Sequence, residues 1–153
     1  MSYLAIAAVF ILVLVALVLW RRGASHPKPG PLDVSARGER SIEEFHRGFY
    51  ADLGIESVQD IRDVLEAVSR ATGLPAGKLE PTDDLGAIAA ANGLQRAFLV
   101  AQLANEFPEA QGEILGKAAA GQFIYLHHAI ALVVNARVNA RAAGKKDAPK
   151  VEG

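Results

Sequence analysis

The chain has 153 residues, of which 51% are hydrophobic and 22% charged, with a formal net charge of −1 and no cysteine. Without cysteine, disulfides and thiol chemistry are excluded. Residues 41–136 carry thirteen acidic side chains against six basic ones, which argues against nucleic-acid binding because that function needs a basic surface.

An uncharged stretch of eighteen residues runs from Tyr3 to Trp20. As a helix it would be about 27 Å long, close to the hydrocarbon thickness of a bilayer. Tyr3 and Trp20 stand at its two ends, where aromatic rings prefer the membrane interface, and Arg21 and Arg22 follow at once. We therefore expect residues 1–22 to form a transmembrane anchor that contacts the lipid bilayer.

Two other readings of this stretch are less favoured. A cleaved signal peptide would have a basic start and a small-residue cleavage site, which this stretch lacks. A buried core helix is rarely apolar on all faces. Because the basic residues follow the span, the positive-inside rule predicts a single-pass protein with its N-terminus outside and its C-terminal domain cytoplasmic.

Basic segments flank the acidic part of the chain. Residues 23–40 contain Pro27, Pro29 and Pro31 and little apolar content, which predicts a linker. Residues 144–153 are expected to form a basic flexible tail. Residues 21–40 and 137–153 each have a net charge of +3, which suits either an anionic lipid surface or simple solvation.

Residues 41–143 are expected to form one helical domain. Ser41 and Glu44 have the spacing of a capping box. They open a helix whose apolar residues are predicted to be Ile42, Phe45, Phe49 and Leu53, with Gly54 at its end. Ser57 caps the next helix, which ends at Gly73 after a stripe of apolar residues: Val58, Ile61, Val64, Leu65 and Val68.

Helical patterns also fill the second half of the domain. Thr82-Asp83-Asp84 predicts a cap before a short helical turn. Further helices are expected over 94–107, where Leu94, Phe98, Leu99, Leu103 and Phe107 form the apolar stripe and Pro108 ends it, and over 113–119 and 122–143. Strand alternation and hairpin signals are missing from the sequence, so the predicted fold class is all-α.

From Ser57 to about Val134 the order of these signals resembles an acyl carrier protein. Residues 99–107, Leu-Val-Ala-Gln-Leu-Ala-Asn-Glu-Phe, read like that family's Leu-Val-x-x-Leu-Glu-x-x-Phe. Gly73-Leu74 is similar to its Leu-Gly-Val region, and Leu79 and Leu85 are similar to its loop anchors. The resemblance covers about half the chain and implies a small carrier-like helical bundle.

The chain departs from this family at the attachment site. The family's Asp-Ser-Leu is replaced by Asn92-Gly93-Leu94, and Gly93 has no hydroxyl to which phosphopantetheine can be esterified. Gln95 and Arg96 replace acidic residues on the face that the family's enzymes recognise. We therefore expect no cofactor, and we expect the fold to tolerate Gly93→Ser because serine caps helices well.

Other candidate sites have structural explanations. His127 and His128 are neighbours, so on a helix one should face the interior and the other water, and a shared metal is not expected. Asp83 and Asp84 fit helix capping better than a cation site, and His46 is expected on the surface. Nucleotide-binding and nucleophile–base patterns are missing from the sequence, so neither a metal site nor an enzyme is expected.

Arg137, Arg141 and Lys145 are spaced four residues apart and share one face of the last helix. They are candidates for contacts with lipid phosphates, or they complement the C-terminal end of the helix dipole.

Two functions remain open. The first is a non-catalytic, membrane-anchored interaction module, an accessory or scaffold subunit of a membrane protein complex. The alternative is a carrier-like protein that handles lipid or acyl chains at the membrane surface.

Overall fold

The computed structural model describes residues 30–53, 55 and 57–146, with side chains up to Ala143. The expected membrane span, with Tyr3, Trp20, Arg21 and Arg22, lies outside the described residues, as do residues 147–153 of the predicted tail. Residues 144–146, which were also predicted to belong to that tail, are the end of the last helix. Among the helices that are described, none has both the length and the hydropathy needed to cross a bilayer.

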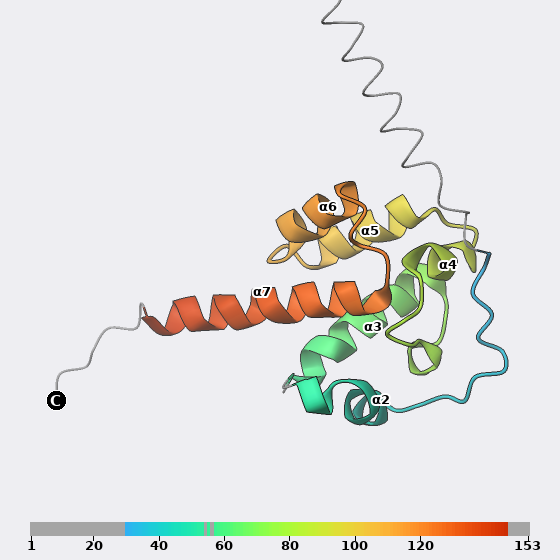
Figure 1. Ribbon diagram of the computed structural model, residues 1–153, viewed down its shortest axis with the longest axis horizontal. Helices are drawn as coiled ribbons and strands as arrows, with labels where there is room; N and C mark the ends of the chain where they lie inside the picture. Colours follow the sequence, from blue (N-terminus) through green and yellow to red (C-terminus); the bar gives the residue numbers. More distant parts are fainter. Residues whose placement is uncertain (1–29, 54, 56, 147–153) are drawn as a thin grey trace, which may run out of the picture.

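The described chain is helical, as predicted, and its only bridge between extended residues joins Asp84 to Tyr125. Its elements are α2 (Ile42–Phe49), η1 (Ala51–Leu53), α3 (Val58–Thr72), η2 (Ala76–Lys78), α4 (Leu85–Ala90), α5 (Arg96–Glu106), α6 (Gln111–Ala119) and α7 (Leu126–Lys146). Figure 1 shows α5 and α6 on one side of α7 and α2 on the other.

Helix α3 lies at the centre of the packing, against α2, α5 and α7, while α5 also packs against α4 and α6. The predicted stripe of α3 forms the core: Ile61, Val64, Leu65 and Val68 are fully buried. They meet buried side chains of the other helices, which include Leu99, Leu103, Ile114, Leu126, Ile130 and Val133. Burial of this apolar surface is the main force that holds the helices together.

Several helix ends follow the predicted local chemistry. The Ser41 hydroxyl accepts the Glu44 N–H at 3.2 Å, and the Glu44 carboxylate accepts the Ser41 N–H at 2.9 Å, which completes the capping box. Ser57 caps α3 through the Asp60 N–H. Gly73 ends α3 with a left-handed φ of 71°.

The apolar stripes differ from the prediction in two places. Helix α2 ends at Phe49 because Tyr50, five residues after Phe45, is buried with it; a continued helix would turn that side chain away from the core. Phe49 is 38% exposed, and Leu53, beyond the end of the helix, is 69% exposed, so neither belongs to the buried face as predicted. On α5, Leu99 and Leu103 face the core, so Phe98 lies about 100° away and is 49% exposed.

The predicted linker over 23–40 is too long at its C-terminal end. The Leu32 N–H donates to the Ala87 carbonyl at 3.0 Å, and the Arg40 N–H donates to Gly77 at 2.9 Å. A Cβ at Gly77 would lie 2.4 Å from the Arg40 carbonyl oxygen, so this close approach requires glycine. Val34 is buried. Residues 32–40 therefore belong to the folded domain.

Candidate functional site

Asn92-Gly93-Leu94 ends one helix instead of opening the next. The Leu94 N–H donates to the Ala89 carbonyl at 2.9 Å and the Gly93 N–H donates to Ala90 at 3.0 Å. Together with the φ of 68° at Gly93, these two bonds form the Schellman motif that terminates α4. Helix α5 begins only at Arg96, with Gln95 as its N-cap.

The backbone therefore supplies its own reason for a glycine at position 93. A left-handed φ is strained for residues with a Cβ, although nothing lies within 4 Å of where that atom would stand. Gly93→Ser was expected to be tolerated because serine caps the start of a helix. That reason is wrong, since residue 93 follows the end of α4 and does not open α5. Gly93 itself is exposed and carries no group that reacts.

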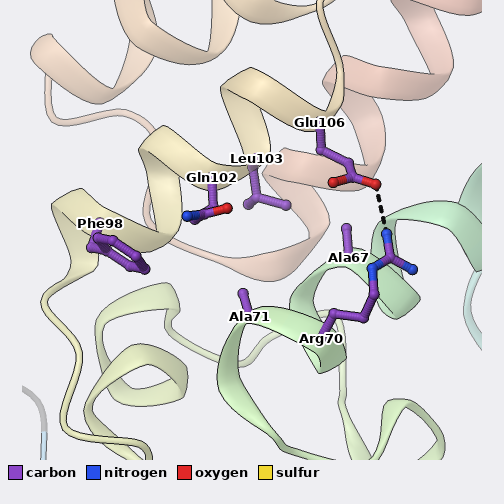
Figure 2. Close-up of a pocket in the computed structure, with 7 residues that line it drawn as sticks. All are labelled: Ala67, Arg70, Ala71, Phe98, Gln102, Leu103 and Glu106. Atoms are coloured by element: carbon purple, nitrogen blue, oxygen red, sulfur yellow. Dashed lines mark hydrogen bonds and ion pairs between the residues drawn. The ribbon is translucent and has the colours of Figure 1, made fainter.

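A groove of about 280 Å³ lies between α3 and α5. Figure 2 shows the side chains of α5 along one wall and those of α3 along the other, with Phe98 at one end. At the opposite end, the Arg70 guanidinium donates to the Glu106 carboxylate at 2.6 Å. The groove is lined by Ala67, Arg70, Ala71, Phe98, Gln102, Leu103 and Glu106.

The solvent-facing side of α5 is uncharged over most of its length. Between Arg96 and Glu106, which bear the two charges of this helix, its exposed residues are Ala97, Phe98, Ala101, Gln102 and Asn105. By contrast, the exposed and half-buried positions of α3 include Arg62, Asp63, Glu66 and Arg70. The solvent-facing side of α5 between Arg96 and Glu106 is therefore neutral, with small or amide side chains around one half-exposed aromatic ring.

The main buried charge is Asp60, which is 1% exposed. Arg137 and Arg141 on α7 each donate to its carboxylate at 2.9 Å. Arg137 also donates to Asp63, and to Glu109 at 2.8 Å, so it ties α7 to α3 and to the segment before α6. Burial raises the pKa of Asp60, but hydrogen bonds from Ser57, Arg137 and Arg141 outweigh this and leave it below its usual value.

This cluster corrects the predicted use of the basic face of α7. Arg137 binds three carboxylates of the domain, and its side chain is only 23% exposed. The prediction that this residue contacts lipid phosphates is therefore wrong. Arg141 also binds Asp60, although its side chain remains 57% exposed. The Lys145 side chain lies outside the described part. Sequence reasoning missed the cluster, yet Asp60 shares the helical face of Val64 and Val68, which indicated its burial.

The two adjacent histidines do not separate into interior and surface. Both are half-buried, and their ring centroids lie 4.2 Å apart. His127 Nδ1 lies 3.0 Å from the Pro81 carbonyl, while His128 Nδ1 accepts the N–H groups of Ile124 and Tyr125. His46, which was expected on the surface, is also half-buried, with Nε2 2.6 Å from the Ile55 carbonyl.

The paired aspartates have separate structural roles. Asp84 caps α4 by accepting the N–H groups of Gly86 and Ala87, as the sequence predicted. Asp83 is 5% exposed and accepts two hydrogen bonds from the Arg37 guanidinium, at 2.8 and 2.9 Å. Within the part of the chain that is described, no group of three or more acidic or histidine side chains is placed to hold a metal ion.

The chain was compared with models of protein families, with characterised proteins and with solved structures. None of the three comparisons found a match. The resemblance to acyl carrier proteins therefore stays a prediction.

Proposed function

We propose that this protein is a membrane-anchored, non-catalytic interaction module, an accessory or scaffold subunit of a membrane protein complex. The observation that carries the proposal is the neutral face of α5, with Phe98 half-exposed beside the groove against α3. Side chains that are depleted in charge and include an exposed aromatic ring are typical of the centre of protein interfaces.

The membrane part of the proposal rests on the sequence. Residues 3–20 have the length and composition of a single span, and their one-sided arginines favour an N-terminus outside and a cytoplasmic domain. An anchored domain meets its partners within the membrane plane. A modest interface is then sufficient, because tethering raises the effective concentration of both proteins.

A protein partner fits the groove better than an acyl chain does. Three of its seven lining residues, Arg70, Gln102 and Glu106, are polar or charged. A hydrocarbon tail would leave these groups without water, at a cost in free energy. In addition, the protein has no hydroxyl at Gly93 to which a phosphopantetheine arm could be attached, which argues against a carrier-like function.

The absence of catalysis is proposed because the buried or half-buried acidic and histidine side chains have structural partners, while the unpaired hydroxyl of Tyr50 is buried away from any substrate. Asp60 is held by two arginines, Asp83 by Arg37, and His128 by two backbone amides. A general acid or base must instead be free to reach a substrate.

Photocrosslinking in native membranes tests the proposal. A photoreactive amino acid replaces Ala101, in the middle of the α5 face, or Arg47, an exposed residue of α2, which lies on the other side of α7 (Figure 1). We expect a discrete adduct with a membrane protein from position 101 and a much weaker one from position 47. Equal labelling from both positions, or adducts with lipid alone from position 101, would refute this interface.

A further inference from the structure

The first turn of α7 is capped by a histidine. His128 is the third residue of this helix, and its Nδ1 accepts the N–H of Ile124 at 3.1 Å and that of Tyr125 at 3.2 Å. Glutamate or glutamine usually holds this place in a capping box. An imidazole can replace them only while Nδ1 is unprotonated, because the lone pair of that atom receives both bonds. The geometry thus requires the neutral ring with its proton on Nε2.

The same end of α7 holds a loop of the domain in place. The Leu126 N–H donates to the Asp83 carbonyl at 2.9 Å, and the Leu85 N–H donates to the Ile124 carbonyl at 2.8 Å. The His127 N–H also donates to the Pro81 carbonyl at 2.9 Å. Residues 81–85 are therefore joined to residues 124–127, directly beside the two amides that His128 caps.

The surroundings of His128 do not favour a positive charge. His127 on the same helix and Lys117 on α6 act on it electrostatically, and a positive charge on either of them disfavours protonation of His128. The loop contributes two carboxylates, but Asp83 is bound by Arg37 and Asp84 by the first amides of α4. The positive end of the α7 dipole acts in the same sense, because cations are unfavourable at a helix N-terminus.

We propose that His128 is an acid-sensitive cap, whose protonation releases the Ile124 and Tyr125 amides, frays the start of α7 and loosens the loop 81–85. His127 does not share this role. Its Nδ1 faces a carbonyl and must donate, and a protonated ring donates equally well.

The direction of the effect follows from linkage. Burial, followed by the charges of His127 and Lys117, lowers the pKa of His128 from its ordinary value of 6.5. The folded protein therefore binds this proton less readily than the unfolded chain. Stability from the cap is complete above the ordinary pKa and is lost as the pH falls below it.

Thermal unfolding of the full chain in mild detergent tests the proposal, at about pH 7.5 and about pH 5.5, which bracket histidine titration. His128→Gln keeps an acceptor at the capping position without a titratable charge, and His127→Gln is the matched control. We expect the wild type and His127→Gln to lose about 4–8 °C more in Tm on acidification than His128→Gln, the shift typical of one lost cap in a domain of this size.

Nitrogen NMR of the histidine rings provides a second, independent measurement. We expect His128 to carry its proton on Nε2 and to titrate below 6.5, the ordinary value. A proton on Nδ1, a pKa above the ordinary value, or the same loss of Tm in His128→Gln as in the wild type would overturn the proposal.

Discussion

Gly93→Ala tests whether the backbone, and not only a lost hydroxyl, explains the residue at the centre of the carrier-like motif. At a φ of 68° the new Cβ would be strained, at a cost of roughly 1–2 kcal/mol. Its surroundings add nothing, because no atom lies within 4 Å of its position. The unfolded chain becomes less flexible, which offsets about 0.4–1 kcal/mol. We therefore expect a net loss of about 1 kcal/mol in the free energy of unfolding.

The matched control is Gly116→Ala, in the middle of α6. Gly116 is exposed, also has nothing within 4 Å of where the added methyl group would stand, and has an ordinary helical backbone. The same substitution should here stabilise the protein by about 0.5–1 kcal/mol, because alanine favours the helix. Gly93→Asn should lose less than Gly93→Ala, since asparagine tolerates the left-handed region.

Urea unfolding of the full-length variants, followed by helical circular dichroism, measures these differences as shifts in the midpoint at constant m-value. The two alanine variants should shift the midpoint in opposite directions. A Gly93→Ala variant that is as stable as Gly116→Ala would refute the backbone explanation and leave the loss of a serine as the sole account of this glycine.

Three further predictions concern the charge cluster, the core and the anchor. Arg137→Met should cost about 3 kcal/mol in the free energy of unfolding measured in urea, because Asp60, which is 1% exposed, would keep only one arginine. A loss below about 0.5 kcal/mol, typical of surface changes, would contradict the role of the cluster. Leu103→Ala should cost about 2–3 kcal/mol in the free energy of unfolding, the lower part of the range for core truncations, because the void opens into the groove. Val138→Ala, at an exposed position, should be nearly neutral. Equal effects of the two substitutions would contradict the packing of α5. Protease added to intact cells should leave the domain after Arg40 undigested if the N-terminus is outside, and its digestion there would contradict the proposed topology.

Local signals in the sequence were sufficient for the fold class and for several helix ends. The capping box of Ser41, the caps at Ser57 and Asp84, and the apolar stripe of α3 each involve residues within about three turns of one another. Their outcome depends on the geometry of a single helix, so it can be read from spacing alone. The all-α prediction is confirmed for the described residues, whose named elements are all helices. It could be made from the sequence because such local signals recur along the domain.

Contacts between distant segments were decided only by the tertiary structure. Arg37 and Asp83 are 46 residues apart, and Arg137 and Asp60 are 77 residues apart. Whether an arginine meets a carboxylate or remains in solvent depends on how two elements pack, which no local pattern encodes. For this reason the basic face of α7 was predicted to meet lipid phosphates or to complement the helix dipole, and residues 32–40 were predicted to be part of a linker.

The exposed face of α5 could not be predicted from the sequence for the same reason. Phe98 belongs to a helix with apolar residues on more than one face, and only the packing of α5 against α3 and α4 decided that Leu99 and Leu103 are buried while Phe98 is left half-exposed. The glycine of Asn92-Gly93-Leu94 is visible in the sequence, but its role in ending α4 depends on two hydrogen bonds that form once the chain turns. Composition and spacing determined which segments are helical and where the chain is expected to enter the membrane, whereas tertiary packing decided which side chains remain available to a partner.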